Sequence, residues 1–92
     1  STTEARLRSL EAQGAGDQDL RNQKWLQAYI DYKRAVQIAS DRADAHLRLA
    51  MALIALGQYD SAAVSLKRAV LLDASLPQSE FTLATLFGPG SE

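Results

Sequence analysis

The chain has 92 residues and a formal net charge of −1, with 47 % apolar residues, 23 % charged residues and no cysteine. This length predicts one domain, and the near-zero charge argues against nucleic acid or an anionic membrane surface as a partner. The absence of cysteine excludes disulfides and thiolate metal sites but leaves the compartment open. No uncharged apolar run approaches about 18 residues, so no membrane insertion is expected.

The composition favours helix along the whole chain. Alanine, leucine, glutamine, arginine and glutamate are good helix formers, and no window alternates strictly between apolar and polar residues as a strand would. The first helix is expected over residues 2–22, because Ser1 and Glu4 have the spacing of a capping box. Gly14 and Gly16 fall inside it, and each costs about 1 kcal/mol relative to alanine, so they require a packing reason.

Three further helices are expected between turn residues. The second is predicted over residues 25–39 and the third over residues 43–56, after which Gly57 is suited to a left-handed helix end. Asp60 is expected to cap the fourth helix, which ends at about Leu72. A last helix is expected to start at Pro77, so the chain is expected to contain about five helices.

The chain contains an internal repeat with a period of 34 residues. The tetrapeptide Lys-Arg-Ala-Val occurs at residues 33–36 and again at residues 67–70. The same shift aligns residues of similar size and polarity, namely Trp25 with Tyr59, Ala28 with Ala62, Tyr32 with Leu66 and Ile38 with Leu72. The predicted organisation is one domain with a first repeat over about 9–42, a second over 43–76 and a terminal helix over 77–87.

This period and its residues resemble the tetratricopeptide repeat, whose pattern reads W-x2-L-G-x2-Y, then A-x3-F, then P. The corresponding positions hold Ala12, Ala15, Gly16, Asp19, Ala28 and Tyr32 in the first copy, and His46, Leu49, Ala50, Leu53, Ala62 and Leu66 in the second. Asp19 departs from the pattern, which has a large aromatic residue at that position. The resemblance implies an all-α fold, a right-handed superhelical stack of antiparallel helix pairs, or α-solenoid.

The resemblance also implies a protein–protein interaction scaffold that binds a peptide or helix of a partner protein. The concave groove of such a stack is lined by the first helix of each pair. The matching positions hold Gln13, Asp17, Arg21, Leu47, Arg48, Met51, Ile54, Phe81, Thr82 and Thr85. The apolar members of this set suit an amphipathic helix or an apolar peptide. The alternative is that Leu47, Met51 and Ile54 pack against the preceding helix or against a neighbour that is missing from this chain.

Two arginines in this set have a second interpretation. Arg48 lies four residues after Asp44, and Arg21 lies four residues after Asp17. Side chains at this spacing are neighbours on a helix and form solvated ion pairs of about 0.3–0.5 kcal/mol. Each arginine is therefore expected either to pair within its own helix or to contact a partner.

The last expected helix, residues 77–87, carries apolar residues on more than one side. A terminal repeat normally has a polar outer face, because no further repeat covers it. Two interpretations follow. Either the chain is a piece of a longer repeat protein, or Leu83, Leu86 and Phe87 mediate self-association as a homodimer. Self-association is thus the alternative function to peptide binding.

No group of residues suggests catalysis. His46 is the single histidine and occupies a position at which the repeat pattern places a large packing residue, so it is expected to be structural. No further metal ligand lies at a useful spacing from it. Neither paired carboxylates nor a glycine-rich phosphate loop is recognisable. We therefore expect neither an enzyme nor a bound metal or cofactor.

Overall fold

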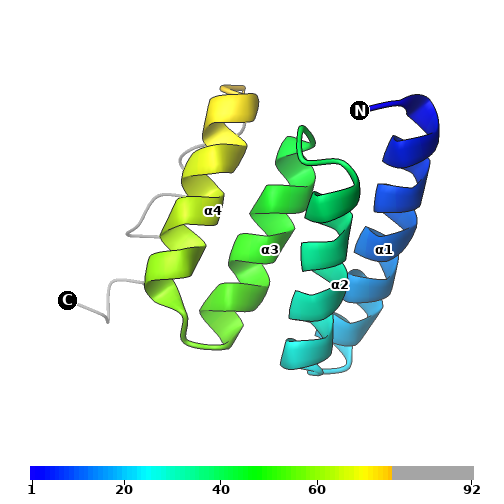
Figure 1. The fold of residues 1–92 in the computed structure, drawn as a ribbon. Coiled ribbons are helices and arrows are strands. Elements are labelled where there is room, and N and C mark those ends of the chain that lie inside the picture. Colours follow the sequence, from blue (N-terminus) through cyan, green and yellow to red (C-terminus); the bar gives the residue numbers. More distant parts are fainter. Residues whose placement is uncertain (76–92) are drawn as a thin grey trace.

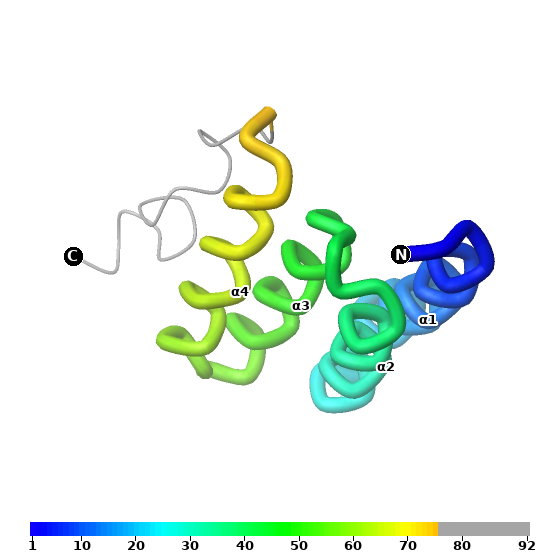
Figure 2. The backbone as a smooth tube through the Cα atoms, turned by 45° about the horizontal axis from the view of Figure 1, so that its top comes forward, coloured from blue at the N-terminus to red at the C-terminus, as the bar shows by residue number. Residues whose placement is uncertain are grey.

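The computed structural model describes residues 1–75 and contains four α-helices in that range. They are α1 (Thr3–Arg21), α2 (Trp25–Ile38), α3 (Ala43–Ala55) and α4 (Tyr59–Leu72). Figures 1 and 2 show them side by side in chain order, with α1 against α2 and α3 against α4. The predicted all-α stack of helix pairs is confirmed. The helix expected over 77–87 lies outside the described residues.

The starts of two helices differ from the predictions by one or two residues. Thr2, not Ser1, caps α1, because its hydroxyl oxygen accepts a hydrogen bond from the Ala5 amide at 3.0 Å. The prediction that Asp60 caps the fourth helix is wrong, since α4 already begins at Tyr59. Asp60 lies in the first turn instead, where a negative charge is favoured by the helix dipole.

Both helix pairs turn through the same hydrogen-bonded helix end. Gly57 has φ +77°, as predicted, and Gln23 has φ +60° at the equivalent place 34 residues earlier. The Gln58 amide donates to the Leu53 carbonyl at 2.8 Å, and the Lys24 amide donates to the Asp19 carbonyl at 2.9 Å. This bond is that of a Schellman motif, in which glycine suits the left-handed position best. Gln23 therefore carries a steric cost that Gly57 avoids.

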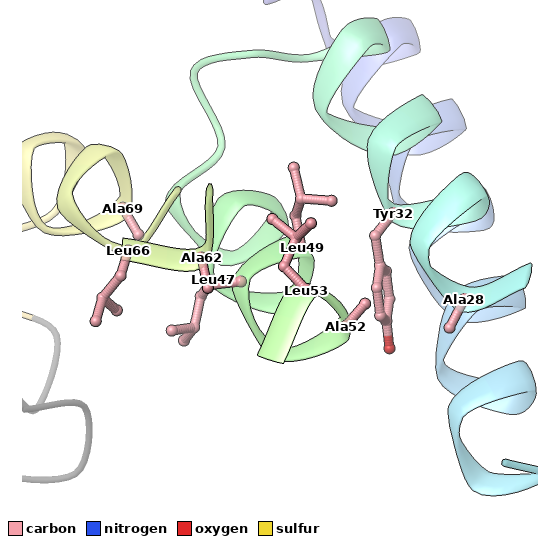
Figure 3. Close-up of a cluster of buried hydrophobic side chains, with 10 residues drawn as sticks. Ala28, Tyr32, Leu47, Leu49, Ala52, Leu53, Ala62, Leu66 and Ala69 are labelled. Carbon is pink, nitrogen blue, oxygen red and sulfur yellow. The ribbon is translucent and has the colours of Figure 1, made fainter. Parts of the chain in front are cut away.

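The core is built from small residues that let the helices approach and a few large ones that fill the space. Ala28 and Ala62 are buried, as the repeat predicts. Tyr32 of α2 is fully buried and lies against Gly16 of α1, where an added Cβ would be 2.5 Å from the tyrosine ring. Figure 3 shows this tyrosine beside Ala52 of α3. Gly16 thus has the packing reason that its position requires.

The two glycines of α1 provide a matched test of this packing. We expect Gly16→Ala to destabilise the fold by about 1–3 kcal/mol, because the buried Tyr32 ring has no room to move. Gly14 has nothing within 4 Å of its Cβ position. Gly14→Ala should therefore stabilise α1 by about 1 kcal/mol. Urea unfolding followed by circular dichroism measures both, and equal effects of the two substitutions would contradict this packing.

The repeated turn provides a second test. Gln23→Gly should raise the free energy of unfolding by about 1 kcal/mol, because it removes the steric cost of a side chain in the left-handed region. Gly57→Ala, at the equivalent position of the second repeat, should lower it by a similar amount. Thermal unfolding of the two variants measures the two changes in stability, which should have opposite signs. A destabilised Gln23→Gly protein would refute the equivalence of the two turns.

Candidate functional site

The face shared by α1 and α3 brings together three residues that the sequence analysis placed on a binding wall, Gln13, Asp17 and Arg48. Arg48 of α3 donates from Nη1 to the Asp17 carboxylate of α1 at 3.0 Å. The Tyr32 hydroxyl of α2 donates to the same carboxylate oxygen at 2.5 Å. Arg48 Nε also lies 3.5 Å from Asp44, four residues earlier on α3. Asp17 therefore joins side chains from all three of these helices.

Further polar contacts link α1 to the N-terminal end of α3 through buried side chains. Gln13 donates from Nε2 to Asp44 at 2.9 Å and accepts from Arg42 Nη2 at 2.9 Å. The other terminal nitrogen of Arg42 donates to the Ser9 hydroxyl at 2.8 Å, and Ser9 donates to the Ala35 carbonyl at 2.7 Å. Arg42 is almost fully buried, and a buried charge needs such partners. We call Ser9, Gln13, Asp17, Arg42, Asp44 and Arg48 the interhelical polar network.

The electrostatics favour the protonated forms of two donors, the Tyr32 hydroxyl and the Arg48 guanidinium. Burial, reinforced by the neighbouring Asp17 carboxylate, raises the pKa of the Tyr32 hydroxyl, so it remains a donor. Burial alone would lower the pKa of Arg48, but the Asp44 and Asp17 carboxylates outweigh it and raise the pKa of that guanidinium. Tyr32 and Arg48 therefore remain hydrogen-bond donors to Asp17 throughout the neutral range.

Some of these residues were predictable from the amino-acid sequence and others were not. Arg48 does pair with Asp44, as the four-residue spacing indicates, but it also reaches across to α1. Asp17 pairs with Arg48 rather than with Arg21, which is exposed. The roles of Ser9 and Arg42 have no signal in the sequence, because their partners lie on other elements.

The apolar members of the expected wall are not equivalent. Leu47 is only 8 % exposed and belongs to the buried core cluster, whereas Met51 is 40 % exposed. Ile54 is half-buried and packs against the same core. The packing interpretation thus accounts for Leu47, and Met51 is the residue of this group that a ligand reaches most easily. The predictions for Phe81, Thr82, Thr85, Leu83, Leu86 and Phe87 lie outside the described residues.

His46 has a structural environment. It is buried, and its Nε2 atom lies 2.7 Å from the Ser40 carbonyl oxygen. Within residues 1–75, no three histidine, aspartate or glutamate side chains gather in a way that could hold a metal ion. In the same range, no helix has the length and apolar character needed to cross a membrane.

A pair of carboxyl groups lies between α1 and α2. Asp31 is 8 % exposed, and both its burial and its hydrogen bond with the Asp19 carboxyl raise its pKa above the ordinary value. Arg34 lies 3.7 Å away and opposes this effect. The expectation that the chain has no paired carboxylates is therefore wrong. Asp19 occupies the position where the repeat pattern has an aromatic residue, and its partner comes from the next helix.

The comparison with protein families agrees with this architecture. The tetratricopeptide repeat pattern matches residues 19–79. The chain belongs to the tetratricopeptide repeat family, whose members generally mediate protein–protein interactions and are typically non-catalytic modules. Comparisons with curated proteins and with solved structures find no match.

The Asp19–Asp31 pair predicts a specific pH dependence of stability. Because the pKa of Asp31 is raised on folding, the folded state binds the proton more tightly, and the contribution of Asp31 to stability falls as pH rises through its folded pKa. Asp31→Asn removes this effect, so its stability relative to wild type should increase as pH rises above the ordinary aspartate pKa, until it passes the raised pKa of Asp31. Urea unfolding at several pH values measures the difference.

The partner residue provides the check. Asp19→Asn removes the carboxyl group that contributes to the raised pKa of Asp31 and should reduce the same pH dependence. In the double variant, the two effects should not add, because both report one interaction. A constant difference between Asp31→Asn and wild type across this pH range would contradict the pairing.

Proposed function

We propose that this chain is a protein-binding module that holds a peptide or helix of a partner protein against the face formed by α1 and α3. The family assignment supports the general class. We infer no catalytic role. The observation that carries the proposal is the fixed Asp17–Arg48 pair beside the exposed Met51.

The interhelical polar network supports a preorganised receptor. Arg48 and Met51 are three residues apart on α3, so their side chains are neighbours. The hydrogen bonds of Asp17 use its Oδ1 atom, which leaves Oδ2 as an acceptor for a ligand N–H group. A ligand can thus place an apolar side chain on Met51, which adapts its shape readily, and a polar group on Asp17. Because the receptor side chains are already ordered, less entropy is lost on binding.

Site-directed photo-crosslinking identifies the partner and tests the face together. The chain has no cysteine, so Met51→Cys can be labelled uniquely with a benzophenone. Leu26→Cys is the matched control, because Leu26 is an exposed apolar residue of α2 that lies outside the polar network. We expect one protein from an extract of the source cells to crosslink at position 51 and not at position 26. Mass spectrometry identifies it and maps the crosslinked segment.

The identified partner then permits a quantitative test. Met51→Glu should weaken its binding by about 1–3 kcal/mol, whereas Leu26→Glu should change it by less than about 0.5 kcal/mol. Isothermal titration calorimetry measures both. Equal affinities of the Met51→Glu and wild-type proteins would exclude this face as the binding site.

The alternative function, self-association through Leu83, Leu86 and Phe87, makes a different prediction. It requires a dimer whose population increases with concentration. Light scattering of the chain alone measures this, and a monomer at all concentrations would exclude the alternative without affecting the proposal for α1 and α3.

A further inference from the structure

Two cavities lie on the other side of α3, one between α2 and α4 and the other between α4 and the segment that connects α2 to α3. One, of about 280 Å³, is lined by residues that include Lys33, Leu49, Leu53 and Val64. The other, of about 300 Å³, is lined by residues that include His46, Arg68, Leu71 and Leu72. Both have α3 residues as their base and α4 residues as one wall, and Figure 1 shows α3 between α2 and α4. We call these two cavities together the α2/α4 furrow.

The base of the furrow follows one face of α3. His46, Leu49 and Leu53 are spaced by three and four residues, which places them on the same side of a helix over a length of about 10 Å. Successive residues of an α-helix are rotated by about 100° around its axis, so Met51 and Arg48 point in nearly the opposite direction from these three residues. The furrow is therefore separate from the face assigned to the proposed function.

The α4 wall exposes apolar side chains. Val64 is 54 % exposed and Leu71 is 76 % exposed, and Leu72 is also exposed. Large side chains of this kind, at spacings of seven and eight residues along one helix, form a ridge rather than isolated surface positions. Such a ridge beside a cavity marks a surface that can bury apolar groups of a partner.

Each side of the furrow contributes one cation. Lys33 comes from α2 and Arg68 comes from α4. Neither cavity is lined by an aspartate or glutamate, and none of the ion pairs found within residues 1–75 involves either residue. Lys33 instead lies 5.5 Å from the centre of the Tyr29 ring and donates to the Tyr29 hydroxyl at 3.1 Å. The furrow is thus apolar at its base and positively charged at its sides.

The repeated Lys-Arg dipeptide contributes one residue from each copy to the lining of the furrow. The helices α2 and α4 flank the furrow from opposite directions, so they face it with different sides. Lys33 therefore lines the furrow on α2, whereas Arg68 lines it on α4. The other two members, Arg34 and Lys67, line neither cavity. Arg34 lies near Asp31 instead. A repeated basic pair therefore places a cation on each wall of a furrow between consecutive repeats.

We propose that the α2/α4 furrow is a second docking surface, and that its occupant is an amphipathic helix of a partner protein with acidic residues flanking an apolar stripe. The exposed ridge of Val64, Leu71 and Leu72 on α4 matches the stripe, because the apolar anchors of an amphipathic helix recur along one of its sides. The two cations match the acidic flanks by charge complementarity. The surface is distinct from the α1–α3 face and does not depend on it.

A designed peptide tests this surface directly. The probe is a fluorescein-labelled peptide of about 14 residues, with leucine every three or four positions and glutamate on both flanks. Fluorescence anisotropy with the full chain should show saturable binding that weakens as salt increases. The Lys33→Glu/Arg68→Glu double variant should weaken it by about tenfold or more, and Arg34→Glu/Lys67→Glu, with the same charge change, by less than about twofold.

Two further measurements show whether the peptide binds in the furrow of a folded protein. Circular dichroism should find the helical signal kept in both double variants, and amide chemical shifts of Leu49, Leu53 and Val64 should move on peptide addition. Met51→Glu, on the other face, should leave the dissociation constant unchanged. Absence of binding, equal loss in the two double variants, or a loss caused by Met51→Glu would overturn the proposal.

The remaining outcomes assign the furrow to a different occupant and also overturn the proposal. A spin label on Thr85→Cys that broadens the furrow amides without peptide would assign it to the chain's own C-terminal segment. A dimer that Arg68→Glu dissociates in light scattering would assign it to a second copy.

Discussion

The packing of Tyr32 into the notch at Gly16 is the contact on which the arrangement of the first three helices depends. The ring is fully buried and occupies the space that a Cβ at Gly16 would need. This sets how closely α1 and α2 approach. The hydroxyl of the same residue reaches Asp17, which also binds Arg48 of α3. One side chain therefore couples the spacing within the first helix pair to the position of the second.

The polar contacts that follow from this packing change the character of the α1–α3 face. Gln13, Asp17 and Arg48 hold one another in place through direct bonds and through Asp44, so they form a rigid surface rather than a set of mobile ligands. Arg42 anchors that surface from the buried side.

The central helix α3 has a different surface on each side. Small residues such as Ala45, Ala50 and Ala52 are buried against its neighbours and let them come close. The two surfaces of α3 that these contacts leave open differ in chemistry. The surface towards α1 is polar and contains the Asp17–Arg48 ion pair, whereas the surface between α2 and α4 is apolar and flanked by cations. Helical periodicity keeps these two surfaces of α3 apart, although residues 1–75 form only two repeats.

The helices, their pairing and the family could be predicted from the amino-acid sequence, because they depend on local propensity and on a 34-residue repeat of small and large residues. The turn at Gly57 was predictable for the same reason. The sequence left open whether Leu47 packs or binds, and it did not indicate the Asp17–Arg48 bond or the carboxyl pair of Asp19 and Asp31. These features depend on distances of a few ångströms between helices and on the rotation of each helix about its axis. A periodic pattern indicates which residues share a side of a helix, but it does not contain those distances.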